Sequence, residues 1–227
     1  MNWQAILLTV RLATTVCALL LVIALPLAYW ISFSNRRWRF LVEAVIALPL
    51  VLPPTVLGYY MLVAFSPHSF FGRLADSLFS IRLAFSFPGL VLASVIYSLP
   101  FAVQPVANAF SAVDSRLLHA AAVLGASRWR CFRTIILPLS KAGILTGAVL
   151  TFAHTVGEFG VVLMVGGNIP GATQTISIAI YDDVQALNYA SAARTSALLL
   201  LFSFVALAVV YAVNRRSSIL WSTARSA

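Results

Sequence analysis

Long runs of residues without a charged side chain alternate with short charged segments along the chain. The uncharged runs cover residues 12–34, 44–72, 83–113, 142–157 and 195–214. A helix that crosses a bilayer needs about 20 mostly apolar residues. The pattern therefore predicts an all-α integral membrane protein with five transmembrane helices, the fourth continuing past Glu158 to about Val165. A sixth span over 172–190 stays open, although Asp182 and Asp183 disfavour a full crossing.

The composition agrees with a membrane protein. Of the 227 residues, 61% are hydrophobic and 9% are charged, and the mean hydropathy is +0.96. A soluble domain carries about a quarter charged residues. We expect one transmembrane domain over residues 9–214 and a cytoplasmic C-terminal tail over 215–227. Cys17 and Cys131 lie in very different settings and indicate no disulfide framework.

The net charge of +9 is distributed unevenly between the loops. One set of loops carries eleven basic residues: Arg36, Arg37, Arg39, Arg116, Arg128, Arg130, Arg133, Lys141, Arg215, Arg216 and Arg225. The other set carries four: Arg11, Arg73, Arg82 and Arg194. Basic residues gather on the cytoplasmic side of membrane proteins. The first set and the C-terminus are therefore predicted to be cytoplasmic and the N-terminus periplasmic, and the charge indicates topology rather than a nucleic-acid partner.

One of these basic segments reads HAAAVLGASRWRCFRTIILPL, from His119 to Leu139. Asp114 can cap a helix ahead of it, and Gly125 can end that helix and let the chain turn. A second short helix is expected over residues 127–136, and Pro138 begins the next span. Small and apolar side chains beside arginines suit insertion into a groove of a cytoplasmic partner. An ordinary basic loop is the alternative interpretation.

The second uncharged run contains LPLVLPPTVLGYYML, residues 48–62, with prolines at 49, 53 and 54. Proline frees backbone carbonyls, which a membrane tolerates where the helix faces protein or a water-filled cavity. Pro53, Pro54 and Thr55 are therefore candidates for a solute path or gate. A kinked structural helix is the alternative.

The segment HTVGEFGVV, residues 154–162, places Glu158 between Gly157 and Gly160 near the outer end of a span. An intramembrane carboxylate is a functional candidate, although a carboxylate that snorkels to the interface or pairs two helices is the alternative. Because a carboxylate repels anions, we expect Glu158 to support a hinge or gate, paired with a polar neighbour, rather than to contact an anionic solute.

The cytoplasmic segment resembles a motif of ATP-binding-cassette (ABC) importer permeases, in which Glu-Ala-Ala, three residues, Gly and nine residues precede Ile-x-Leu-Pro. Here His119 replaces the usual Glu, and the remaining positions match in type and spacing. The resemblance implies a type I ABC importer transmembrane domain, in which this segment is the coupling helix that docks on an ATPase subunit. The implied coupling residues are His119, Ala120, Ala121, Leu124, Gly125, Ile135, Leu137 and Pro138.

The proline-rich run, the Glu158 segment and GGNIPGATQTI, residues 166–176, resemble the permeases of molybdate importers in particular. This resemblance implies transport of a tetrahedral oxyanion that a periplasmic molybdate-binding protein delivers. Asn168, Pro170 and Gly171 are candidate docking residues for that protein, as is the outer loop 66–82. The hydroxyls of Thr55, Thr155 and Ser177 are candidate donors along the path. Permeases for tungstate or sulfate are related alternatives.

The chain contains no Gly-x-x-x-x-Gly-Lys-Ser/Thr phosphate-binding loop, and Lys141 is its only lysine. We therefore expect two partner ABC ATPases to bind ATP and Mg, while this chain is no enzyme and binds no metal or cofactor. Five helices are few to enclose a hydrated path, so a homodimer in membrane lipid is expected. Two other classes of protein stay open. A membrane enzyme is disfavoured because the three histidines form no pair at metal-ligand spacing. An ATP-independent secondary transporter is disfavoured because it normally needs more charges within the membrane than Glu158 alone.

Overall fold

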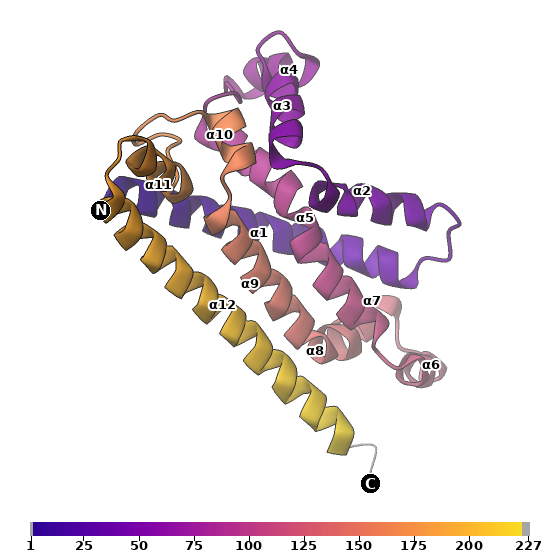
Figure 1. Ribbon diagram of the computed structural model, residues 1–227. Coiled ribbons are helices and arrows are strands. Elements are labelled where there is room, and N and C mark those ends of the chain that lie inside the picture. The colour runs from indigo at the N-terminus through magenta and orange to yellow at the C-terminus, as the bar shows by residue number, and fades with distance from the viewer. Residues whose placement is uncertain (1, 224–227) are drawn as a thin grey trace.

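The structure, a computed structural model, describes residues 2–223, with side chains up to residue 213, and every regular element in that range is helical (Figure 1). The elements are α1 (Trp3–Phe33), α2 (Arg39–Val51), α3 (Pro54–Phe65), α4 (Phe70–Phe79), α5 (Phe87–Ser111), α6 (Ser115–Val123), α7 (Arg128–Cys131), a π-helical turn η1 (Phe132–Ile136), α8 (Leu137–Leu139), α9 (Lys141–Gly157), α10 (Gly160–Gly166), α11 (Ile176–Gln185) and α12 (Tyr189–Thr223).

Three helices, α1, α5 and the 189–213 part of α12, are long and apolar enough to cross a membrane unaided. Two bent pairs have the same character: α2 with α3, bent by 111°, and the segment 128–139 with α9, bent by 69°. Five candidate spans result when each pair counts once, so the predicted all-α membrane fold is confirmed. The sixth span left open over 172–190 is not formed, because α11 has only ten residues.

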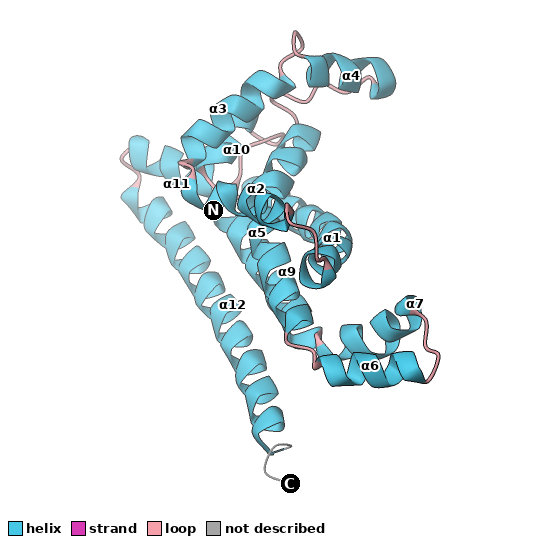
Figure 2. Cartoon of the chain, turned by 90° about the vertical axis from the view of Figure 1, so that its right-hand side faces the viewer, coloured by secondary structure: helices cyan, strands magenta, loops and turns pink. Residues whose placement is uncertain are grey.

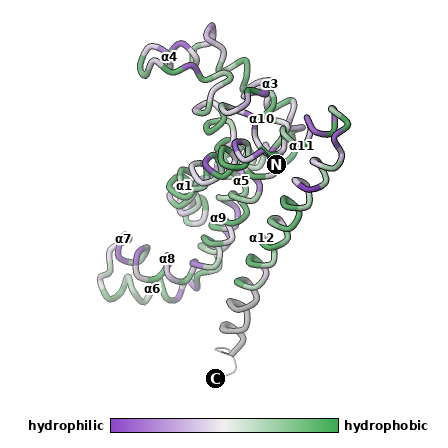
Figure 3. Tube along the Cα trace, turned by 90° about the vertical axis from the view of Figure 1, so that its left-hand side faces the viewer, coloured by the Kyte–Doolittle hydropathy of each residue, from purple (hydrophilic) through white to green (hydrophobic). Residues whose placement is uncertain are grey.

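The centre of the bundle is the packing of α1, α5 and α9. The fully buried side chains of Leu12, Leu20 and Phe110 belong to its core. Glycines let α9 approach α5 closely: a Cβ at Gly147 would lie 2.9 Å from the carbonyl oxygen of Ala102. Small residues serve this purpose widely in membrane helices. The long helix α12 lies along α9 and is largely uncovered up to residue 213 (Figures 1 and 3). Its backbone continues as a helix past residue 214 without a break.

Two helix predictions are wrong in detail, and each has a local cause. The run 44–72 is not one helix, because Pro53 and Pro54 lack backbone N–H groups and disfavour helical geometry in the residue before them. The fourth helix does not continue to Val165. It stops at Gly157, Glu158 takes an extended backbone with φ −66° and ψ 132°, and α10 restarts at Gly160.

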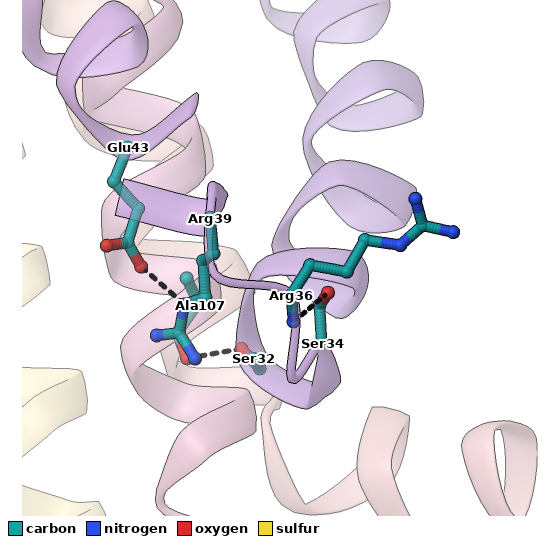
Figure 4. Close-up of polar contacts among 6 residues, drawn as sticks. All are labelled: Ser32, Ser34, Arg36, Arg39, Glu43 and Ala107. Carbon is teal, nitrogen blue, oxygen red and sulfur yellow. Dashed lines mark hydrogen bonds and ion pairs between the residues drawn. The ribbon is translucent and has the colours of Figure 1, made fainter. Parts of the chain in front are cut away.

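The structure gathers the basic loops at one end of the bundle. The corner between α1 and α2 carries Arg36 and the Arg39–Glu43 ion pair, whose N–O distance is 2.8 Å (Figure 4). Beside it, the Ser32 hydroxyl donates to the carbonyl of Ala107 at 3.0 Å, which ties the end of α1 to the part of α5 that leads into α6 (Figure 4).

The opposite end holds the start of α1 and the outer loops. The Thr9 hydroxyl accepts a hydrogen bond from the backbone N–H of Ile176 at 2.9 Å, which joins α1 to α11. The backbone N–H of Phe85 donates to the carbonyl of Val165, also at 2.9 Å, and joins the segment before α5 to α10. For the loops up to residue 213, the grouping behind the topology prediction therefore matches the fold, while the side of the membrane that each group faces stays a prediction. Arg225 of the predicted C-terminal tail lies outside the described residues.

Candidate functional site

The segment between α5 and α9 forms a helix, a tight turn and a second short helix, as the sequence predicted. Asp114 caps α6, its carboxylate accepting from the backbone N–H of Arg116 at 2.8 Å. At the end of α6 the N–H of Gly125 donates to Ala122 and the N–H of Ala126 donates to Ala121, both at 2.9 Å. This hydrogen-bond pair is a Schellman motif, which needs a left-handed residue. Gly125 supplies it, with φ +76°.

The first half of this segment presents apolar side chains without a partner in the chain. Val123 and Leu124 are 88% and 86% exposed, and α6 has no buried residue. His119 and Ala120 are also exposed and Ala121 is half-buried. Figure 2 shows α6 and α7 projecting sideways from the end of the bundle. An exposed pair of large aliphatic side chains on a small-residue helix is the geometry expected of a docking element.

The second half attaches the segment to the bundle instead. Ile135 packs partly against the central core, Leu137 is half-buried and Pro138 is exposed in α8. Sequence reasoning missed Phe132, whose ring packs edge-on against Tyr29 of α1 at a centroid distance of 5.3 Å. The coupling residues named from the sequence therefore divide into an exposed group, 119–125, and a group that connects it to the spans, 135–138.

The breaks in the two broken segments lie against each other. A Cβ on Gly160 would lie 2.6 Å from the Cβ of Pro54, so the start of α10 touches the start of α3. One turn further along α3, Gly58 packs against α10, where an added Cβ would lie 2.7 Å from the Cβ of Met164. The structure thus brings Pro54 and Gly160 together from widely separated parts of the sequence. The periodicity of the sequence gave no sign of this contact.

Glu158 occupies the break between α9 and α10 and is only 7% exposed. Its Oε1 accepts from the backbone N–H of Val161 at 2.8 Å, so the carboxylate caps α10. The polar neighbour expected for Glu158 is therefore a backbone group. Next to it, Gly157 is exposed, with nothing within 4 Å of the position a Cβ would take.

The other residues proposed for the path differ in their surroundings. Pro53 and Thr55 are exposed at the start of α3. Thr155 is buried, and its hydroxyl donates to the carbonyl of Thr151 at 2.9 Å. Ser98, on α5, contacts the Thr155 hydroxyl at 3.1 Å and Nδ1 of His154 at 3.0 Å. The Thr155 hydroxyl is thus committed to an α5–α9 contact that sequence reasoning missed.

The outer loop between α10 and α11 is held by a network of amide and carboxylate groups. The amide nitrogen of Asn168 donates to both carboxylate oxygens of Asp182, at 2.8 and 2.7 Å. Gln174 donates to the same carboxylate at 2.8 Å and accepts from Asn2 at 2.9 Å. The Asn168 side chain therefore fixes the loop, while Pro170 and Gly171 are exposed at its tip. Ser177 donates to a backbone carbonyl at 3.4 Å.

Within the described part of the chain, no group of three or more His, Cys, Asp or Glu side chains is arranged to hold a metal ion.

Comparison with known proteins shows which family has this sequence and fold. The family model described as "Binding-protein-dependent transport system inner membrane component" matches residues 14–219. The molybdenum transport system permease protein ModB of Azotobacter vinelandii is 50% identical over 93% of both chains. Its counterpart in Escherichia coli K12 is 42% identical over 81% of this chain and 80% of its own. A bacterial alginate ABC transporter, solved with a periplasmic protein carrying an alginate pentasaccharide, superposes with a TM-score of 0.72 at 20% identity, covering 96% of this chain and 78% of the other.

Up to five candidate spans, two of them bent, are the architecture of a multi-pass membrane protein. The chain belongs to the family of binding-protein-dependent transport system inner membrane components. The chain is therefore an ABC importer permease of the inner membrane, a channel subunit and not an enzyme.

Proposed function

We propose that this chain is the permease subunit of an ATP-driven importer that moves molybdate across the bacterial inner membrane. The observation that carries the proposal is the 50% identity to a molybdenum permease over 93% of both chains. The proposed assembly contains two copies of this chain, two ABC ATPase subunits that bind ATP and Mg, and a periplasmic molybdate-binding protein. The basic end of the bundle is cytoplasmic and the N-terminus periplasmic in this proposal.

The coupling step is assigned to the exposed part of the cytoplasmic segment. Val123 and Leu124 enter a groove of the ATPase, because burying two large aliphatic side chains stabilises a contact by about 1.5–3 kcal/mol each. The Schellman turn at Gly125 sets the angle between α6 and α7. Motion of the ATPase then reaches α9 through the packed Phe132 and the helical turns around Pro138, which join the segment to the bundle.

The gate is assigned to the place where the two breaks meet. Residues 53–55 and 157–160 change direction there without a continuous helix, so a small rotation about either break changes the contact between α3 and α10. Glu158 holds the start of α10 through the N–H of Val161 and is buried. That arrangement supports the gate without presenting a free carboxylate to an oxyanion. Binding-protein docking is assigned to the tip of the outer loop, at Pro170 and Gly171.

Reconstitution tests this function directly. The permease, its ATPase and its binding protein are placed in lipid nanodiscs, and ATP hydrolysis is measured with molybdate, tungstate or sulfate. Molybdate is expected to stimulate hydrolysis at the lowest concentration, and uptake in proteoliposomes is expected to require the ATPase. Equal or better stimulation by sulfate contradicts the substrate assignment. Uptake that persists without an ATPase contradicts the ABC mechanism and favours a secondary transporter.

A further inference from the structure

The short outer helix α4 presents apolar side chains away from the rest of the chain. Phe70, Phe71, Leu74 and Leu78 are 68%, 60%, 43% and 64% exposed. Their spacing of i, i+1, i+4 and i+8 places them on one side of a helix. Figure 3 shows apolar and polar stretches alternating along α4. The helix is therefore amphipathic, with its apolar side turned outward.

The orientation of α4 about its own axis is fixed by contacts with its own chain. Gly72 is buried against the carbonyl oxygens of Ser66 and Phe65, where an added Cβ would clash with backbone. Ala75 packs against the smaller apolar cluster that contains Met61. The Ser69 hydroxyl accepts from the N–H of Gly72 at 2.9 Å and caps the helix. Because α4 cannot roll to bury its apolar side, that side needs a partner.

The remaining exposed side chains of α4 are Arg73, Asp76, Ser77 and Phe79, so the rest of the helix is mostly polar and electrically balanced. Arg73 and Asp76 are exposed, one cation and one anion, so the helix offers no net charge to a charged protein surface. Four apolar side chains are also few compared with the roughly 20–30 residues that each partner contributes to a specific protein interface. A partner that needs only apolar area, with a polar face left in water, fits this helix better than a second protein.

Neighbouring elements continue the apolar surface. Tyr59, Tyr60 and Val63 of α3 are 54%, 65% and 50% exposed, and α3 belongs to a candidate span. Tyrosines are enriched where a membrane protein passes from acyl chains to headgroups. The segment after α4 is tied to α10 by the Phe85–Val165 hydrogen bond, at the end of the bundle that holds α11. The apolar side of α4 therefore adjoins further exposed apolar side chains on a helix of a candidate span.

We propose that α4 lies in the plane of the membrane interface, with Phe70, Phe71, Leu74 and Leu78 among the acyl chains and Arg73 and Asp76 in water. The partner is the lipid leaflet on the side where α4 emerges, which is the periplasmic leaflet in the proposed orientation. Amphipathic helices bind in this manner through their buried apolar area. Within α4, only the polar side then stays available to a binding protein.

Spin labels measure the depth of each face in the full permease–ATPase complex in nanodiscs. Single cysteines replace residues 71, 74 and 78 on the apolar side and 73 and 76 on the polar side, in a transport-competent background with Cys17 and Cys131 replaced. Collision rates with oxygen, which concentrates in lipid, are compared with those of a water-soluble nickel chelate. The exposed residue 200 of α12 serves as the lipid reference.

The ratio of oxygen to nickel collisions is expected to be higher at all three apolar positions than at both polar positions, and to approach the ratio at residue 200. Nickel-dominated collisions at all five positions of α4 overturn the proposal. Protection of residues 71, 74 and 78 from both reagents also overturns the proposal, because it means that a protein covers them. Dipolar broadening between labels identifies a second copy as that protein, and protection that appears only after the binding protein is added identifies the binding protein. A lipid-soluble carbene reagent applied to the unsubstituted complex gives a second measurement: residues 70–79 are expected to be labelled, and absence of label there also overturns it.

Discussion

Gly125 offers the sharpest test of the proposed coupling segment, because the structure separates backbone strain from steric clash at this position. Its φ is +76°, and nothing lies within 4 Å of the place a Cβ would occupy. Substitution therefore costs only the strain of a left-handed backbone, about 1–2 kcal/mol for an ordinary residue. Asparagine tolerates this region, whereas a β-branched residue does not. We therefore expect transport to fall progressively in the series Gly125→Asn, Gly125→Ala and Gly125→Val.

A cost of 1–2 kcal/mol lowers the ratio of formed to unformed turn by roughly 5- to 30-fold. We expect this loss of the turn to affect transport, because α6 has no buried residue that would hold it in place without the turn. The assay is molybdate-stimulated ATP hydrolysis and uptake by the reconstituted complex, with co-purification of the ATPase as a check on assembly. We expect Gly125→Asn to retain most uptake and Gly125→Val to lose most of it while still inserting into the membrane. Equal uptake by the Asn and Val variants refutes the role assigned to the turn.

Three other predictions follow from the gate and the outer loop. Gly160→Ala forces a Cβ against a proline across the contact, so we expect a loss of about 1–3 kcal/mol of stability and reduced uptake. Gly157→Ala meets open space and should match the parent in melting temperature. Glu158→Gln keeps an oxygen that accepts the capping hydrogen bond, so assembly should survive while uptake falls, and unchanged uptake would return Glu158 to a structural role. Glu158→Ala removes that oxygen and should also lose about 1 kcal/mol of stability, measured by thermal melting. Asn168→Asp sets a carboxylate against the carboxylate of Asp182 that the amide now binds, so proteolysis of the outer loop should accelerate and stimulation by the binding protein should drop.

The sequence predicts the fold class well because lipid imposes a strong constraint. A span needs an uninterrupted apolar run, and the runs around α1, α5 and α12 are visible without any tertiary information. The Schellman turn was equally accessible, since a glycine after an alanine-rich helix fits few other conformations. These features are local, so residues within one turn of each other decide them.

Breaks and contacts between distant segments were less accessible. Proline at 53 and 54 marked a disturbance, yet nothing in the pattern showed a bend of 111° rather than a kink. The run after Gly157 stays apolar, so hydropathy alone predicts a continuous helix where Glu158 in fact leaves it to cap α10. The contact between Pro54 and Gly160 joins segments about a hundred residues apart, and no single-sequence periodicity records such a pairing. The hydroxyl contact of Ser98 with Thr155 is of the same kind.

The two breaks also explain why irregular backbone survives in a membrane at all. Each break removes helical hydrogen bonds, and an unpaired backbone group in hydrocarbon costs several kcal/mol. Glu158 compensates one break by accepting from the N–H of Val161, while Pro54 has no N–H to leave unpaired. The glycine contact at residue 160 then sets one break against the other, which covers backbone with protein rather than with lipid. A replacement that separates α3 from α10 exposes both breaks together. The Gly160 and Glu158 variants should therefore show non-additive losses of stability in a double-mutant cycle, and strictly additive losses would mean that the two breaks are independent of each other.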